Sequence, residues 1–331
     1  MSNTLKDSNE EKKIYTTGIS KLLRIQELGL LGFIVAFCIF ITIIDPTFLY
    51  FNNIISILRS SVFIFIIGCG MTFVLVGGEI DLSVGSVFGF TAVAFSLLLH
   101  AGINIFLSMI ITLILGIIVG LITGLIIVRF KIPALIVTLG MLYIYSGIIY
   151  GYTKVRPISV PQNLEVIGYG DIFGIPYLVI IAVIVGIISH AILNYTSFGY
   201  NVRCVGGNKL AAVAGGINVN RTKITLFMIT GLLSALAGIL IIFRLSAGKA
   251  TIGEGYELYV ISAVIIGGSS IYGGIGTVFG SFLGALLISI IMNGMMAMRV
   301  DPYWQSIFIG LIMIIAVGLD QLRRRKMWQV S

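Results

Sequence analysis

Two acidic side chains lie close together between two long apolar runs. The segment GGEIDLSVGS, residues 77–86, carries Glu79 and Asp81 within three positions. Ionisable groups in such surroundings are unfavourable, so they usually face a cavity, a partner or an interface. Asp81 has an alternative role, because its carboxylate can accept hydrogen bonds from the first N–H groups of a following helix, at Ser83 or Val84. Glu79 has no such local role, so Glu79, Asp81 and Ser83 are candidate pathway or gating residues.

A basic segment is the long polar stretch inside the chain. Residues 196–223 read TSFGYNVRCVGGNKLAAVAGGINVNRTK and carry Arg203, Lys209, Arg221 and Lys223 but no Asp or Glu. Residues 208–215 are rich in alanine and end at two glycines, which predicts a short helix. Such a loop can be a docking surface for a soluble partner. An ordinary basic connector is the alternative that the loop alone leaves open.

The composition indicates the solvent in which these groups work. The chain has 331 residues, of which 58% are hydrophobic and only 10% are charged, and its mean hydropathy is +1.10. A soluble domain carries roughly 25% charged residues. The apolar runs are about 20 residues long and lack two-residue alternation, so they predict helices rather than the strands of a barrel. We therefore predict an all-α polytopic membrane protein.

Ten spans are predicted within a transmembrane domain over residues 28–322, between an N-terminal tail (1–27) and a basic C-terminal tail (323–331). They lie near residues 28–44, 54–76, 82–99, 106–128, 132–152, 177–195, 224–243, 257–271, 276–298 and 303–320. This arrangement puts 15 of the 21 Lys and Arg residues on the side of the two termini and 6 on the other. The positive-inside rule makes that side cytoplasmic. The net charge of +8 then reflects topology and anionic lipid rather than nucleic acid.

Further features concern packing and the far side of the membrane. Glycines recur every four residues at 116, 120 and 124 and at 276, 280 and 284, which predicts flat helix faces that pack closely. A second break, at residues 253–258, suggests two inverted five-helix halves, as in many transporters. Asn293 either forms an interhelical hydrogen bond or lines a pathway. The longest external segment, residues 153–176, is either a surface that meets a partner or a connector.

Several chemistries have no counterpart in the sequence. It contains no G-x-x-x-x-G-K-[ST] loop for ATP, no H-E-x-x-H pair and no G-x-S-x-G elbow. His100 and His190 stand alone, and Cys38, Cys69 and Cys204 lack metal-ligand spacing, so we expect no metal and no bound cofactor. The spans also lack a row of buried ionisable groups that would carry protons. The pattern indicates a non-catalytic bundle whose energy input enters from elsewhere.

Four segments carry a family resemblance. GGEIDLSVGS at 77–86, GGNKLAAVAGGINVNRTKI at 206–224, GEGYELYVISAVIIGGSSIYGGIGTVFGSFLGALL at 253–287 and DPYWQSIFIGLIMIIAVGLDQLRRRK at 301–326 resemble the ribose-type permeases of bacterial ATP-binding-cassette importers. Taken together and in this order the motifs are specific, whereas the glycine-rich pieces alone are weak. The likeness spans roughly residues 28–326.

The resemblance implies a multi-pass subunit of the bacterial inner membrane that pairs with a second permease subunit, commonly as a homodimer. A cytoplasmic ATPase, which binds ATP and Mg, docks on the loop at 196–223, and an extracytoplasmic binding protein delivers a monosaccharide. The docking residues that it implies are Gly206, Gly207, Asn208, Lys209, Ala211, Ala212, Gly216 and Ile217. Relatives often carry Glu where Lys209 stands, which suggests a partner with an acid at that contact.

The sequence thus predicts the membrane subunit of an importer for a sugar of the ribose, galactose or xylose class. A nucleoside or the furanose-like autoinducer-2 signal is an alternative cargo for the same architecture. An ion-coupled secondary transporter, which needs no ATPase, is the alternative from a different class.

Overall fold

The computed structural model describes residues 27–160 and 164–301, with scattered residues between 304 and 321. The two predicted tails and most of the predicted tenth span therefore lie outside the described residues. Within the described part, long helices dominate and the few strands have two residues each. The protein is an all-α polytopic membrane protein.

Seven of the described helices are long and apolar enough to cross a membrane. These are Glu27–Ile44, α2 (Phe51–Val76), α4 (Ile105–Phe130), α5 (Ala134–Thr153), α7 (Tyr177–Tyr195), α10 (Val219–Leu245) and α12 (Val278–Ala297). Two shorter apolar helices are α3 (Val84–His100) and α11 (Tyr256–Ile266). The remaining helices are η1 (Pro46–Leu49), α6 (Glu165–Tyr169), α8 (Ser197–Gly207) and α9 (Lys209–Ala214). The count of ten spans stays a prediction.

The helix α11 is shorter than the sequence predicts: it ends at Ile266 rather than near residue 271. Gly268 adopts a left-handed φ of 99°. Its N–H donates to the carbonyl of Ile265 at 2.9 Å, and the N–H of Ser269 donates to that of Val264 at 3.1 Å. This is the glycine-terminated Schellman arrangement, which satisfies the last carbonyls of a helix and stops it.

Two helices, α2 and α10, form the centre of the bundle. The helix α10 packs against α2, α3 and α4, and α2 packs against α7, α11 and α12. In the most apolar 18-residue window, 67% of the residues of α2 and 78% of those of α10 are buried. The helices α4, α5 and α7 instead expose many large apolar side chains, as expected of faces that meet lipid or another subunit.

Five of the six glycines in the predicted stripes lie on a helix at a close contact, whereas Gly276 precedes α12 and lies against the side chains of Ser269 and Val76. A Cβ at Gly120 would overlap the carbonyl oxygen of Phe227, so α4 approaches the backbone of α10 at this position. A Cβ at Gly280 or Gly284 would overlap a carbonyl oxygen of Gly267 or Ala263, respectively. The second stripe therefore brings α12 against α11 and the turn that follows it.

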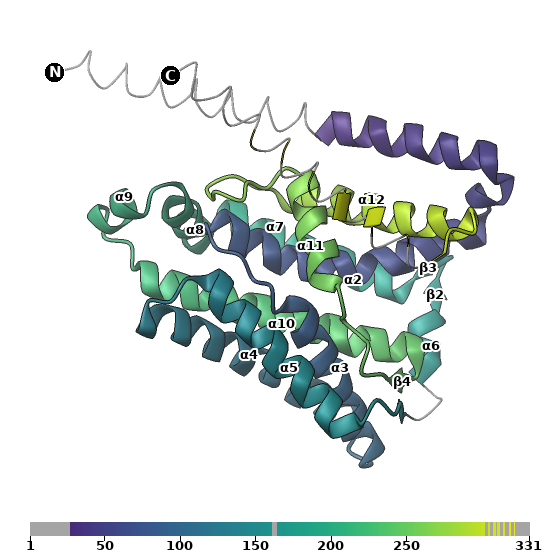
Figure 1. Ribbon diagram of the computed structural model, residues 1–331, viewed down its shortest axis with the longest axis horizontal. Coiled ribbons are helices and arrows are strands. Elements are labelled where there is room, and N and C mark those ends of the chain that lie inside the picture. The colour runs from purple at the N-terminus through teal and green to yellow at the C-terminus, as the bar shows by residue number, and fades with distance from the viewer. Residues whose placement is uncertain are drawn as a thin grey trace.

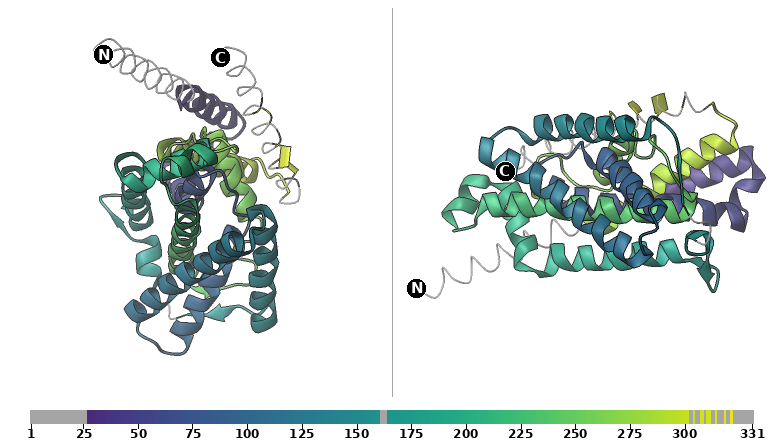
Figure 2. Two further views of the ribbon diagram at one scale, coloured as in Figure 1. Left: turned by 90° about the vertical axis from the view of Figure 1, so that its left-hand side faces the viewer. Right: turned by 90° about the horizontal axis from the view of Figure 1, so that it is seen from below.

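The two ends of the bundle differ. Figures 1 and 2 show α8 and α9 together at one end, which we call the α9 end. At the other end β1 (Ile158–Ser159) pairs with β4 (Ala247–Gly248), and β2 (Asp171–Ile172) pairs with β3 (Ile175–Pro176). The predicted external segment is therefore joined to the chain that follows α10.

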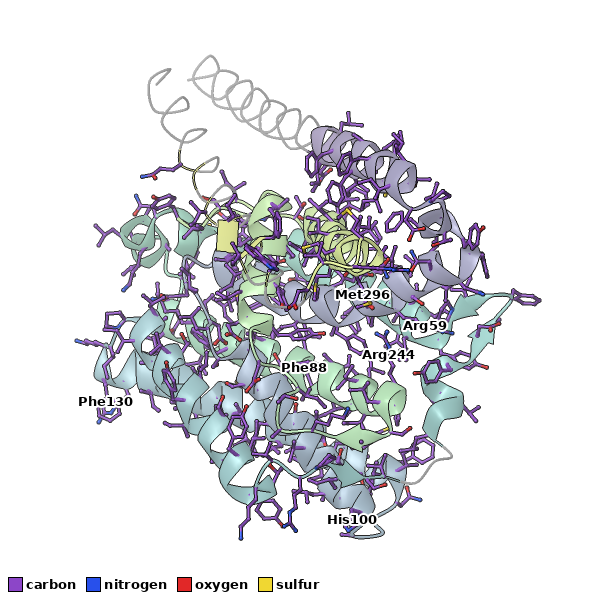
Figure 3. The ribbon with its side chains drawn as sticks, turned by 45° about the vertical axis from the view of Figure 1, so that its right-hand side comes forward. Arg59, Phe88, His100, Phe130, Arg244 and Met296 are labelled. Carbon is purple, nitrogen blue, oxygen red and sulfur yellow. The ribbon has the colours of Figure 1, made fainter. Side chains whose placement is uncertain are left out.

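Arginines hold the end that carries the strands. Arg59 donates to the carbonyl oxygen of Tyr169 at 2.7 Å and lies over its ring. Arg244 lies over the ring of Phe63, 5.8 Å from its centroid. Figure 3 shows both arginines far from Phe130, the last residue of α4, which lies at the α9 end.

Candidate functional site

The basic loop begins with a helix that the sequence analysis did not predict. The hydroxyl of Thr196 caps α8 by accepting from the N–H of Gly199 at 3.2 Å. Arg203 in this helix donates to Asn194 at 2.8 Å and to the carbonyl of Gly276 at 3.3 Å. Its guanidinium is partly buried, and the desolvation lowers its pKa. Arg203 thus fixes α8 to the bundle rather than presenting a free charge.

The predicted short helix is confirmed as α9, and its ends are set by the expected residues. Asn208 is the N-cap, since its side-chain oxygen accepts from the N–H of Ala211 at 3.0 Å. At the other end Gly216 has a φ of 79°, and its N–H donates to the carbonyl of Val213 at 3.0 Å. The N–H of Ile217 donates to the carbonyl of Ala212 at 3.0 Å. A capped helix of this kind is a defined element rather than a flexible connector.

The outward face of α9 is more apolar than the predicted site residues indicate. Leu210 is 83% exposed and Val213 57% exposed. Lys209 and Ala211 are exposed beside them, whereas Ala212 is 4% exposed and packs with Val205 and Val219. The sequence signal for this face is the three-residue spacing of Leu210 and Val213, which puts both on one side of the six-residue helix α9. The opposite side is anchored to the bundle through Ala212.

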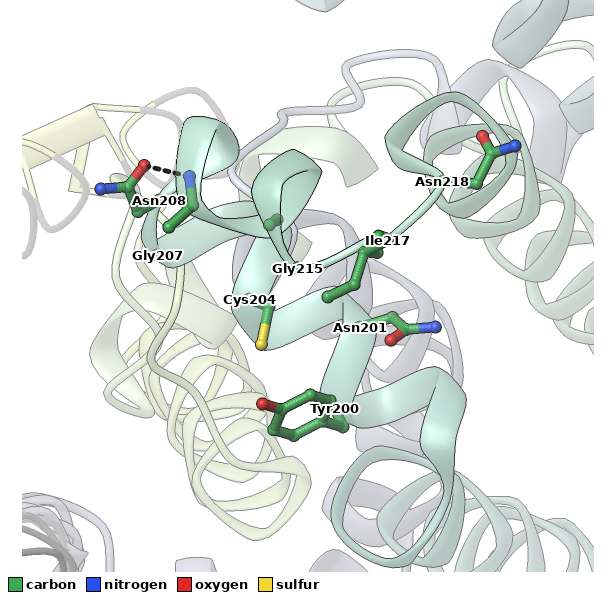
Figure 4. A pocket seen from close by; sticks show the side chains of 11 residues that line it. Tyr200, Asn201, Cys204, Gly207, Asn208, Gly215, Ile217 and Asn218 are labelled. Carbon is green, nitrogen blue, oxygen red and sulfur yellow. Dashed lines mark hydrogen bonds between the residues drawn. The ribbon is translucent and has the colours of Figure 1, made fainter. Parts of the chain in front are cut away.

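A pocket of about 660 Å³ lies between α8 and α9. Figure 4 shows Tyr200, Cys204 and Ile217 around it, together with the hydrogen bond of Asn208 that caps α9. The full lining is Tyr200, Asn201, Cys204, Gly207, Asn208, Ala211, Ala212, Gly215, Gly216, Ile217 and Asn218. Six of the eight predicted docking residues therefore share one hollow; Gly206 and Lys209 do not line it.

Gly206 and Gly207 are adjacent but have different surroundings. A Cβ at Gly206 would overlap the carbonyl oxygen of Val76 and would lie 2.8 Å from the amide nitrogen of Gly274. A Cβ at Gly207 would meet nothing within 4 Å. Gly206 therefore allows the end of α8 to lie against the end of α2 and the turn after α11, while Gly207 is exposed.

Glu79 forms a long-range ion pair with Lys223, near the start of α10. The Glu79 side chain is 13% exposed and that of Lys223 is 16% exposed. The sequence offers no local role for Glu79, and the ion-pair partner of Glu79 lies 144 positions away along the chain. No spacing rule connects residues so far apart, so contact information was needed.

Asp81 and Ser83 lie together just before α3. One carboxylate oxygen of Asp81 accepts from the N–H of Ser83 at 2.8 Å and from its hydroxyl at 2.6 Å. Both residues are buried, at 5% and 2% exposure. The hydrogen bond considered for Asp81 is thus confirmed at Ser83. Asp81 does not cap α3, however, because Ser83 stands at the N-cap position and makes no side-chain cap hydrogen bond. A role in a pathway stays a prediction.

The short helices α3 and α11 begin beside each other inside the bundle. A Cβ at Gly85, in the first turn of α3, would overlap a carboxylate oxygen of Glu257, in the first turn of α11. The same Cβ would lie 2.6 Å from the carbonyl oxygen of Gly253. Glu257 was not among the predicted site residues, although it belongs to the second break. Asn293, a predicted pathway residue, is half-buried in α12. Its role in an interhelical hydrogen bond or in a pathway stays a prediction.

These elements define the class of protein. A bundle of apolar helices with two internal breaks, and with a capped basic loop at one end, is typical of a membrane transport subunit. The chain belongs to the family described as branched-chain amino acid transport system, permease component, and the match covers residues 53–317.

Individual relatives are similar over most of the chain. The ribose import permease protein RbsC of Bacillus subtilis is 36% identical over 94% of this chain and 96% of its own length. The probable ABC transporter permease protein YphD of Escherichia coli is 37% identical over 88% of this chain and 89% of its own. The L-arabinose transport system permease protein AraH of Escherichia coli is 36% identical over 78% and 79%, respectively. No solved structure matches the chain.

Proposed function

We propose that this chain is the permease subunit of an ATP-driven importer for a monosaccharide of the ribose, galactose or xylose class. The observation that carries the proposal is the docking element: a capped helix, α9, exposes Leu210 and Val213 beside a pocket at one end of an apolar bundle. The sequence has no P-loop, so the ATP is bound by a partner. The named relatives that import ribose and L-arabinose favour a sugar over an amino acid.

The partner at the α9 end is a cytoplasmic ATPase, which holds ATP and Mg, while this chain holds no cofactor. Exposed cations at that end support a cytoplasmic orientation, and they include Lys131, Lys209 and Arg221. Both termini then lie in the cytoplasm, and the chain spans the bacterial inner membrane. The eight docking residues predicted from the loop contribute in different ways: Asn208 and Gly216 shape α9, while Gly206 attaches the loop to α2.

The two halves of the domain are inverted repeats, a proposal that the helix contacts support. The helix α2 packs on α11 and α12, and α10 packs on α3 and α4. If α2, α3 and α4 correspond to α10, α11 and α12, the contacts of α2 with α11 and α12 are the counterparts of those of α10 with α3 and α4. Inverted repeats and helices that are interrupted inside the membrane are recurring features of transporters, whose pathways pass the broken helices. The pathway therefore passes the start of α3, where Asp81, Ser83 and Glu257 lie.

The exposed faces of α4, α5 and α7 leave room for a second permease subunit as well as lipid. An extracytoplasmic binding protein approaches the opposite end, where the segment 153–176 pairs with the chain after α10.

The test is co-purification of this chain with the products of neighbouring genes, followed by ATPase measurements in lipid. We expect one sugar-loaded binding protein to stimulate ATP hydrolysis. Stimulation by a loaded nucleoside, autoinducer-2 or amino acid binding protein instead would keep the architecture and replace the cargo. A chain that purifies alone and drives uptake that collapses with the ion gradient would be a secondary transporter.

A further inference from the structure

The ion pair between Lys223 and Glu79 joins the basic loop to the first internal break. Both side chains are largely buried, and removing one partner of such a pair leaves an uncompensated charge in an apolar environment. The two elements that carry the pair are therefore held together strongly. A displacement of one must move the other or separate the charges.

The connection from the docking helix to Lys223 is short and well fixed. Where the chain leaves α9, the N–H of Ile217 donates a hydrogen bond to the carbonyl of Ala212. Asn218 then caps α10 by accepting from the N–H of Arg221 at 2.9 Å, and its carbonyl accepts from the N–H of Thr222 at 3.0 Å. Few free backbone torsions remain between α9 and Lys223, so a movement of α9 reaches the first turn of α10.

The connection from Glu79 to α3 is equally short. Glu79 is tied to the end of α2, because its N–H donates to the carbonyl of Val74 at 3.0 Å after the left-handed Gly78 has stopped the helix. Two residues later Asp81 binds Ser83, which directly precedes α3. The first turn of α3 in turn lies against Glu257 through Gly85. A movement of Glu79 is therefore delivered to the point where α3 and α11 begin.

The other attachment of the loop is at α8 and ends next to the first break. Arg203 and Gly206 attach α8 to the end of α2 and to the turn at residues 273–276. These contacts involve backbone atoms of Val76, Gly274 and Gly276. Gly206 also lies against Gly78, so this attachment stops one residue before the segment 79–83. Within the described residues, the ion pair is the side-chain link from the loop to that segment.

We propose that the Lys223–Glu79 pair is a positioning contact that makes the start of α3 follow a partner docked on α9. This inference rests on the proposed function, because it requires an ATPase at α9. The pair takes no part in docking and does not contact the cargo. Its contribution is to convert movement of the docking helix into movement of the segment that contains Asp81 and Ser83.

The test measures docking and movement separately, in the complex with its ATPase in lipid. A cysteine at Leu82 (Leu82→Cys), in a chain whose three native cysteines are replaced, reports on the segment through its labelling rate. The rate is measured without nucleotide and with ATP plus vanadate. The variants are Glu79→Gln, Lys223→Met and the swap that combines Glu79→Lys with Lys223→Glu. Lys131→Met, an exposed cation at the same end, is the matched control.

We expect nucleotide to change the labelling rate about fivefold or more in the parent and in the Lys131 control, in line with typical coupling between sites. Each single variant should keep its bound ATPase and lose the nucleotide effect, and the swap should restore it. A nucleotide effect that survives in the single variants, an ATPase lost from them, or a swap that restores nothing would each refute the link. A parent chain that binds no ATPase would refute the proposed function itself, and the link with it.

Discussion

Adjacent glycines at the end of α8 should respond in opposite directions to the same substitution. In Gly206→Ala, the new Cβ would overlap the carbonyl oxygen of Val76 and crowd the amide of Gly274, 2.8 Å away, whereas atoms in contact lie about 3.5–4.0 Å apart. Relief requires α8 to move away from α2. Overpacking of this kind costs about 1–3 kcal/mol.

The same movement endangers a hydrogen bond. The N–H of Gly274 donates to the carbonyl of Val76 at 2.8 Å, and the new methyl group would lie beside both atoms. Losing this bond costs a further 0.5–1.5 kcal/mol, roughly. The total destabilisation expected for Gly206→Ala is therefore about 2–4 kcal/mol, the sum of these two ranges rounded.

Gly207→Ala is the matched control. Its Cβ meets nothing within 4 Å and Gly207 does not have a positive φ, so alanine should favour the helix by about 0.4–1 kcal/mol. At about 2 °C per kcal/mol for a chain of this size, Gly206→Ala should lower the midpoint of thermal unfolding in detergent by about 4–8 °C. Gly207→Ala should raise it by about 1–2 °C on the same scale.

The assay is loss of the monodisperse peak after heating, with wild type and both variants in one detergent and at one heating rate. The comparison removes errors that arise because membrane proteins unfold irreversibly. Equal midpoints for the two variants, or a more stable Gly206→Ala protein, would refute the close approach of α8 to the end of α2.

Three further outcomes are expected. Gly120→Leu should prevent a folded bundle, because the side chain would force α4 away from the backbone of Phe227. Gly147→Leu, in open space on α5, should still fold. Equal yields of folded protein for the two variants in size-exclusion chromatography would contradict this. Gly216→Pro should reduce co-purified ATPase while the chain still inserts, since proline cannot adopt a φ of 79° or donate to Val213; unchanged co-purification would count against α9 as the docking element. Lys209→Glu should weaken ATPase binding more at low salt than at high salt, and a salt-independent loss would argue against a charged contact.

Local signals in the sequence were enough to predict the shape of α9, the proposed docking helix. Asn208 and Gly216 stand at the two ends of α9 because a side-chain acceptor is needed at the first and a left-handed residue at the second. The glycines of α4 and α12 likewise lie on close helix contacts, since a four-residue repeat keeps them on one face. Such rules act within a few turns, so they can be read without knowing what packs where.

The rest of the site depends on contacts between distant segments. Glu79 and Gly206 illustrate this: one was left without a partner and the other was assigned to docking. The structure shows that Glu79 holds the loop to the segment before α3 and Gly206 holds it to the end of α2. The exposed Leu210 was missed for the related reason that the orientation of a short helix depends on what anchors its other side. Hydrophobic patterning also overestimated α11, because it does not register the glycines that stop a helix inside an apolar run.

The attachments of the loop suggest why the docking element lies where it does. Through Gly206 the loop meets the turn after α11, which belongs to the second half, and through Lys223 it meets the segment before α3, which belongs to the first. The starts of α3 and α11 meet each other inside the bundle through Gly85 and Glu257. A partner that acted on a loop attached to one half alone would tilt that half as a body. Under the proposed function, attachment to both would let one docked ATPase change how the two breaks lie relative to each other, which is the change that opening and closing a pathway between them requires.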